Sequence, residues 1–244
     1  MGGKAYYPIM LDMVNRVCVI VGGGNVAQRK AGSLIEAGAK VWVISPEVTP
    51  QLEAWREEGS LGIRREEYRP GLPELGEARL VFAATDQAEV NEQVKKEAEQ
   101  MDKLFSMADE QSAGGFLVPA VVRRGRLTVA VSTSGASPAL AASLKRKIED
   151  IFDAAYEPYL DLLHDLRGAV REGETDTQVR QEMFREMLHW PLLEVLQRNP
   201  AGRDGLREGL LERLRKEPTL FGVRRAGEWL LTQDSSRDER QENT

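Results

Sequence analysis

Short apolar runs alternate with amphipathic segments over the first half of the chain. The runs lie at residues 16–21, 40–45, 61–65, 80–85 and 104–108, and the segments 25–37, 48–58 and 91–98 between them carry apolar side chains at helical spacing. Continuous apolar runs are typical of parallel strands that helices cover on both faces. The pattern therefore predicts an α/β fold that begins with a Rossmann-type, doubly wound parallel sheet.

The first apolar run leads directly into three glycines and then into a helical segment. Gly22 would permit a tight turn and Gly24 a close approach of backbone to a pyrophosphate, while Ala27 keeps helix and strand close. A helix that begins near Asn25 would point its free N–H groups at that phosphate. Glycines also close ordinary strand-to-helix turns, but here a second strand follows at the spacing of a βαβ unit. We therefore predict a dinucleotide site.

The residues after the second strand should lie near the ribose of that dinucleotide. They are Ser45, Pro46 and Glu47. Because no acidic residue ends the strand itself, ribose contacts are expected from Ser45, from Glu47 or from the backbone. The sequence places no arginine beside them, which favours NAD over NADP, since a 2′-phosphate is usually held by an arginine.

The fourth apolar run ends in Ala84, Thr85 and Asp86. Ligands of open parallel sheets bind beyond the carboxyl ends of the strands, so these three residues should flank the cofactor. Thr85 or Asp86 could instead cap the helix that follows, and the two roles are compatible.

The fifth apolar run ends beside Asp109 and Glu110. Residues that follow this strand should face the nicotinamide half of the site. A carboxylate there can accept a proton while the cofactor takes a hydride, which is the division of labour that a dehydrogenation needs. The alternative, a solvated loop acid, is equally consistent with the sequence.

Residues 111–148 contain no acidic side chain and carry several arginines and lysines, although the whole protein is acidic. Two strands at 116–122 and 127–132 should form an antiparallel hairpin, followed by a hydroxyl-rich loop and a helix with Ser137 as N-cap. A segment with this charge is expected to bind a polyanionic substrate, and a solvated basic face is the alternative. The candidate contacts are Arg123, Arg124, Arg126, Ser134, Ser137 and Lys145.

The motifs at 7–9, 22–30, 83–86, Asp109 and 132–141 together resemble the precorrin-2 dehydrogenase family of sirohaem synthesis. The resemblance implies oxidation of precorrin-2 to sirohydrochlorin with NAD, and a homodimer built through the segment after the nucleotide domain. It implies that Asp109 is the essential aspartate and that Asn25, Val26, Pro46 and Glu47 contact NAD. Some members also insert ferrous iron, which makes iron a candidate second substrate.

Two positions depart from the family pattern. Ser106 stands where many relatives have asparagine, three residues before the aspartate, and Thr133 stands where some bifunctional relatives carry a modified serine. The first departure leaves the hydrogen bonding of Asp109 open. The second means that no regulatory modification is carried over to this chain.

The last third of the chain alternates charged residues with leucine and predicts amphipathic helices at 156–171, 179–196 and 206–215. The polar residues 233–244 predict a disordered tail. His164 and His189 have no second ligand at helical spacing, so no metal site is predicted. The expected domains are a nucleotide domain at 1–113, a hairpin-plus-helix dimerisation segment at 114–150 and a helical domain at 151–232.

Composition and net charge bear on the classes of partner that the protein can have. With 244 residues and a formal net charge of −6, the chain shows no overall preference for nucleic acid. No apolar run is long enough to span a bilayer, so we expect a cytoplasmic protein without a membrane partner. A different class of function stays open, namely a regulatory dimer that senses NAD(H) without chemistry. Asp109 and the acid-free basic segment argue for the enzyme, because a sensor needs neither.

Overall fold

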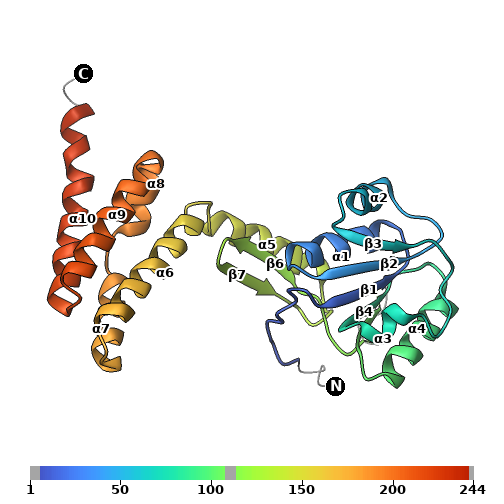
Figure 1. The fold of residues 1–244 in the computed structure, drawn as a ribbon. Helices are drawn as coiled ribbons and strands as arrows, with labels where there is room; N and C mark the ends of the chain where they lie inside the picture. The colour runs from blue at the N-terminus through green and yellow to red at the C-terminus, as the bar shows by residue number, and fades with distance from the viewer. Residues whose placement is uncertain (1–5, 108–113, 242–244) are drawn as a thin grey trace. The chain divides into compact units, whose positions relative to one another are not determined.

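The computed structural model describes residues 6–107 and 114–241, with the side chains of 234–241 left undescribed, and its ribbon is drawn in Figure 1. The chain divides into two compact units, residues 1–119 with 132–138 and residues 120–131 with 139–244. The domain boundaries expected at 113, 150 and 232 stay predictions.

The first unit is built on a parallel sheet of five strands in the order β3-β2-β1-β4-β5. The strands are β1 (Val17–Val21), β2 (Lys40–Ile44), β3 (Leu61–Arg64), β4 (Leu80–Ala83) and β5 (Leu104–Met107). Every pair of neighbours is parallel, so all five carboxyl ends meet at one edge. The predicted doubly wound sheet is confirmed.

Helices cover both faces of this sheet because side chains alternate along each strand. Cys18 and Ile20 of β1 pack with α1 (Asn25–Glu36) and α2 (Pro50–Glu57), whereas Val19 and Val21 pack with α3 (Pro73–Glu77) and α4 (Ala88–Gln100). Ala27 of α1 is completely buried in the core shared with the sheet, as expected of a small residue where helix and strand approach closely. Burial raises the pKa of the Cys18 thiol to about 12, which fits a packing role for this cysteine.

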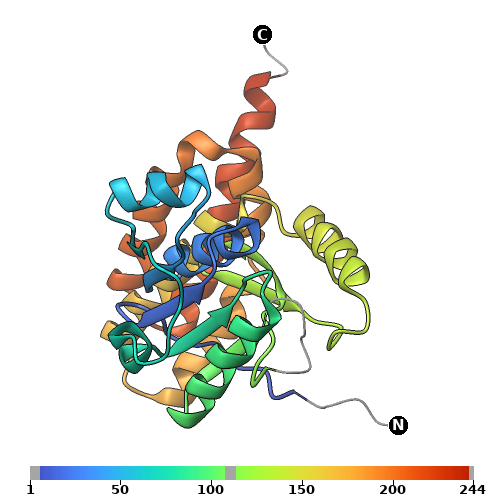
Figure 2. The ribbon, with the colours of Figure 1, turned by 90° about the vertical axis from the view of Figure 1, so that its right-hand side faces the viewer.

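The second unit begins with an antiparallel hairpin of β6 (Ala120–Arg124) and β7 (Leu127–Val131). The strand starts after Pro119 and not at residue 116, because proline cannot donate a hydrogen bond to the ladder. Helix α5 (Pro138–Ile151) follows the hairpin, and none of its side chains is buried. Figure 2 shows α5 standing apart from the other helices of its unit.

The remaining helices share a separate apolar core. They are α6 (Tyr156–Gly173), α7 (Thr177–Met187), α8 (Leu192–Arg198), the short 3-10 helix η2 (Pro200–Gly202), α9 (Arg203–Lys216) and α10 (Leu220–Gln241). Leu166 of α6, Leu210 of α9 and Leu230 of α10 are fully buried in it. Within the described residues, no helix has the length and the apolar character that crossing a membrane requires.

The helices of the last third of the chain differ from the prediction in two places. The segment 179–196 is not one helix but two, α7 and α8, separated at Pro191, whose missing N–H and ring disfavour an uninterrupted helix. Helix α10 was not predicted, and its backbone remains helical over residues 233–241, where polar composition suggested disorder.

The separate core of the helical region leads to a prediction. Leu210→Ala should lower the free energy of unfolding by about 2–5 kcal/mol, because it opens a cavity at a fully buried position. Dinucleotide binding by the first unit should be unchanged in this variant below its melting temperature. Leu75→Ala, at a fully buried position of the first unit, is the matched control. Calorimetry combined with nucleotide titration tests this; weaker nucleotide binding by folded Leu210→Ala would contradict it.

Candidate functional site

The turn between β1 and α1 depends on Gly22. Its φ is +116°, a left-handed conformation that favours glycine. A Cβ at this position would lie 2.4 Å from the carbonyl oxygen of Ala84, beyond the end of β4. The N–H of Gly22 also donates to the carbonyl of Ile44, at 2.9 Å, at the end of β2. This turn therefore packs directly against the ends of both neighbouring strands.

Gly23 approaches the loop after β2 still more closely. The glycine pattern of the sequence assigned no role to this residue. A Cβ at Gly23 would lie 1.9 Å from the carbonyl oxygen of Glu47. The N–H of Thr49 donates to the carbonyl of Gly23 at 3.0 Å. Gly23 is therefore required because the loop after β2 rests on this turn; three consecutive glycines were the only signal of it in the sequence.

Gly24 differs from the other two glycines, because a Cβ there would meet no atom of the described residues within 4 Å. It is the N-cap residue of α1, and no described side chain caps this end of the helix. Asn25 and Val26 form the first turn. Open space beside an uncapped helix N-terminus suits an anionic group such as a pyrophosphate. The residues present thus fit the cofactor that the glycine pattern predicts.

The loop after β2 has buried and exposed parts. Ser45 is buried, and its hydroxyl donates to the carbonyl of Glu47 at 2.6 Å, so its proton holds the loop and is not free for a ribose. Pro46 and Glu47 are exposed. The guanidinium of Arg65 donates from Nη1 to the carbonyl of Pro46 at 3.5 Å. The premise that no arginine lies near this loop is therefore wrong.

The loop after β4 is held by Asn91, which the sequence suggested only as a helix residue. The Asn91 side chain is buried, accepts from the hydroxyl and the N–H of Thr85 at 2.7 and 3.2 Å, and donates to the Thr85 carbonyl at 3.0 Å. Gln87, and neither Thr85 nor Asp86, is the N-cap residue of α4. Thr85 thus fixes the loop, while exposed Asp86 and half-buried Ala84 lie at the carboxyl edge of the sheet.

One cation lies against the α1 face of the sheet. The ammonium of Lys30 sits 4.7 Å from the ring centroid of Phe82, and the rings of Phe82 and Phe116 pack edge-to-face with centroids 5.5 Å apart. Burial lowers the pKa of Lys30, and the neighbouring charge of Arg29 acts in the same direction. Lys30 belongs to the glycine motif in the sequence, but nothing there indicated this placement.

Asp109, the predicted base, lies outside the described residues. The described residues before and after it meet at β5. This strand ends at Met107, and the N–H of Gly115 donates to the carbonyl of Phe105 at 2.9 Å. Among the described residues, no group of three or more His, Cys, Asp or Glu is arranged to hold a metal ion.

The predicted substrate cations do not form one free patch. Arg124 donates from Nε to the carbonyl of Phe152 at 2.9 Å, and Arg126 pairs with Asp161 of α6 at 2.8 Å. Lys145 lies 3.5 Å from Glu149. The fold therefore supplies acids that the segment itself lacks, and only the exposed guanidinium of Arg123 has no hydrogen-bond or ion-pair partner among the described residues.

The hydroxyl-rich loop is closed by its own hydrogen bonds. The hydroxyl of Thr133 accepts from the N–H of Ser137 at 3.0 Å and donates to the Ser137 carbonyl at 3.1 Å. Exposed Ser134 has a left-handed φ of 51°, and its N–H bonds the hydroxyl of Ser132 at 3.1 Å. This loop groups with the first unit, whereas the predicted basic residues belong to the second.

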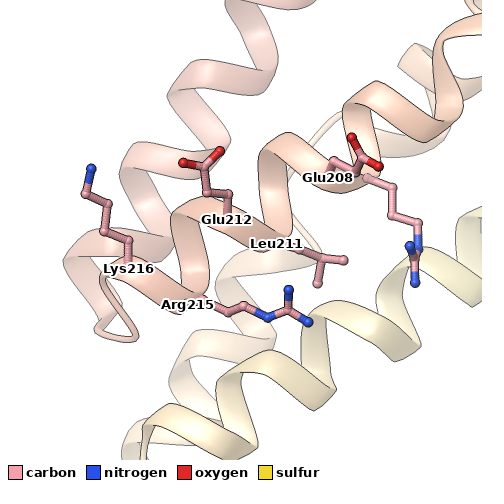
Figure 3. Close-up of a pocket in the computed structure, with 6 residues that line it drawn as sticks. Glu208, Leu211, Glu212, Arg215 and Lys216 are labelled. Atoms are coloured by element: carbon pink, nitrogen blue, oxygen red, sulfur yellow. The ribbon is translucent and has the colours of Figure 1, made fainter.

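A surface groove also runs along α9, lined by Arg207, Glu208, Leu211, Glu212, Arg215 and Lys216. Figure 3 shows Leu211 and Arg215 on the side of α9 that faces α6, with Glu212 and Lys216 pointing away from it. Arg207 pairs with Asp165 of α6 at 2.8 Å. The alternating charges and the exposed position of this groove do not match a dinucleotide or polycarboxylate site.

Comparison with known proteins bears on the whole arrangement. A family model described as putative NAD(P)-binding matches residues 9–120, and one described as sirohaem biosynthesis protein central matches residues 124–151. The solved structure of SirC, a precorrin-2 dehydrogenase, superimposes with a TM-score of 0.69 at 28% identity, over 83% of this chain and 99% of that chain. This chain belongs to the precorrin-2 dehydrogenase family of sirohaem biosynthesis. Its first unit is accordingly a nicotinamide-nucleotide domain.

Other members of the family are larger proteins. The sirohaem synthase of Chromobacterium violaceum is 36% identical over 191 residues, which are 78% of this chain and 40% of that protein. The sirohaem synthase of Nitrosococcus oceani is 34% identical over 207 residues, 85% of this chain and 43% of that protein. The chain thus spans about two fifths of the length of these curated relatives.

The three glycines lead to opposite predictions for two variants. Gly24→Asp should keep the native melting temperature, because the site is open, but should abolish dinucleotide binding by placing a side chain and a negative charge where we expect the pyrophosphate. Gly23→Ala should lower the free energy of unfolding by about 1–3 kcal/mol, because its Cβ overlaps the Glu47 carbonyl. Thermal melts and NAD titrations separate the two effects; native NAD affinity in Gly24→Asp would show that the phosphate assignment is wrong.

Proposed function

We propose that this protein oxidises precorrin-2 to sirohydrochlorin with NAD as the hydride acceptor. The observation that carries the proposal is the open, uncapped turn at Gly24 in a chain that matches a precorrin-2 dehydrogenase over nearly the full length of that protein. The sirohaem synthases that it resembles act in the same biosynthesis by their names. Nothing in the fold or in these relatives favours the alternative of a sensor without chemistry.

The residues of the first unit divide the work of such a reaction. The backbone from Gly22 to Val26 binds the pyrophosphate at the N-terminus of α1. The exposed carboxylate of Glu47 and the backbone of Pro46 receive the adenosine ribose at the end of β2. NAD held there would supply the hydride-accepting chemistry. Asp109, which follows β5, accepts the proton that leaves the substrate with it.

We favour NAD over NADP for two reasons. Glu47 is a carboxylate whose side chain makes no ion pair within the described part of the chain, so it is available to ribose hydroxyls and repels a 2′-phosphate. Arg65, the arginine beside this loop, is already ion-paired with Glu53.

Precorrin-2 carries many carboxylates, and we assign their attraction to Arg123, with Lys145 and the loop hydroxyls of Ser134 and Ser137 as further contacts. Arg124, Arg126 and Lys145 contribute less than Arg123, because groups of their own unit hold them. Ferrous iron is a candidate second substrate. Its insertion requires removal of pyrrole protons, and since the chain has no histidine before His164, Asp109 is the candidate base for that step also.

We further propose that the protein is a homodimer through the hairpin and α5. A two-stranded hairpin is marginally stable alone in water. Helix α5 places Leu144, Ile148 and Ile151 at helical spacing, yet none of its residues is buried and Ile151 is 65% exposed. A partner copy would cover this stripe.

The dimer proposal predicts that Leu144→Glu with Ile148→Glu yields monomers, because charges would then lie in the contact. The single variant Arg146→Glu, which places a carboxylate at an exposed position of the same helix, should stay dimeric. Sedimentation velocity measures both. A wild-type monomer, or a double variant that remains dimeric, would contradict the proposal.

The catalytic proposal is tested at Asp109. Asp109→Ala should bind NAD normally and form NADH from precorrin-2 about 10²–10⁴-fold more slowly, as expected when a general base is lost. Glu110→Ala removes the neighbouring carboxylate and should keep most activity. NADH absorbance follows the reaction, and metal insertion into supplied sirohydrochlorin is measured in parallel. Near-normal NADH formation by Asp109→Ala would refute its role, and a wild-type protein that binds NAD without forming NADH would favour the sensor.

A further inference from the structure

Three charged side chains form a cluster between β3 and α2. Arg65, the residue after β3, pairs through Nη2 with Oε2 of Glu53 in the first turn of α2. The other oxygen of Glu53 accepts from Arg56, with Nε at 2.6 Å and Nη2 at 2.5 Å. Arg56 first, and Arg65 with it, lower the pKa of Glu53, so this carboxylate is ionised at neutral pH.

This cluster touches the loop that receives the ribose. Nη1 of Arg65 donates to the carbonyl of Pro46 at 3.5 Å. Pro46 lies between Ser45 and Glu47, which the close packing at Gly23 fixes against the phosphate-binding turn. In a doubly wound fold the adenosine ribose lies at the end of the second strand, and an arginine there accommodates the 2′-phosphate of NADP. Arg65 is thus in place for a phosphate, but a carboxylate holds it.

We propose that Glu53 determines the preference for NAD by occupying Arg65, and that Arg65 is a latent binding residue for the 2′-phosphate of NADP. This inference rests on the proposed cofactor site. Around the loop, the charges of Arg56 and Arg65 balance those of Glu47 and Glu53. Removal of the Glu53 charge alone would leave one excess positive charge beside the ribose. The side chain of Arg65 is 51% exposed and that of Glu53 26%, so a ligand phosphate can reach the guanidinium.

The test is the ratio of the dissociation constants of NADP and NAD, measured by calorimetry without substrate. Glu53→Gln keeps the size of the side chain and its hydrogen-bonding capacity but removes its charge. It should tighten NADP binding about tenfold, the scale of one charge-assisted hydrogen bond. NAD affinity should change by less than about twofold, because NAD has no phosphate to reach Arg65. The gain should shrink as salt is raised, since the cluster is partly exposed.

Two controls isolate the role of Arg65. The double variant Glu53→Gln with Arg65→Gln should lose the gain in NADP affinity. Glu58→Gln removes an exposed carboxylate at the other end of α2 and should leave the ratio unchanged. An unchanged ratio in Glu53→Gln, or an equal shift in Glu58→Gln, would overturn the inference while the cofactor site stands. If the wild-type protein bound neither nucleotide, the cofactor site itself would be wrong, and this inference with it.

Discussion

The first unit depends on the close contact between Gly23 and the carbonyl of Glu47. No residue with a side chain fits there, because a Cβ would lie 1.9 Å from that oxygen. The contact brings the loop after β2 against the turn after β1, and the Ser45 hydroxyl and the Thr49 N–H hold it in place. Gly22 makes a similar approach to Ala84 after β4. Three strand ends therefore converge through main-chain packing, and the space left open lies at Gly24.

This packing explains why the site can be polar and still well ordered. The side chains that fix the loops are satisfied internally, as with Asn91 and Thr85, so the groups left exposed at the sheet edge, such as Glu47 and Asp86, are those available to a ligand. Arginine side chains near the site are likewise paired within the unit. Arg64 pairs with Glu74 and Glu66 inside the unit, and Arg65 with Glu53, so cations near the site are balanced locally. We therefore expect selectivity among anions to depend on single charges and not on a broad field.

The sequence predicted the sheet and its helices well, because buried parallel strands and amphipathic helices have local patterns. It predicted the open turn at Gly24 for the same reason. It missed what depends on neighbours in space: Gly23 against Glu47, Arg65 beside Pro46 because β3 pairs with β2, and Asp161 of α6 next to Arg126. The break at Pro191 was different, because the proline was a local signal that the leucine pattern outweighed. The role of Asp109 stays a prediction.

We expect the interlocked turn and loop of the first unit to bind a nicotinamide dinucleotide. Amide hydrogen exchange with and without saturating NAD tests this binding, since bound phosphate shields the N–H groups of a helix N-terminus. We expect slower exchange at residues 22–27 and 47–49, with no change in α6–α10. Unchanged exchange in the turn, or protection confined to the helical region, would show that the turn does not bind the dinucleotide.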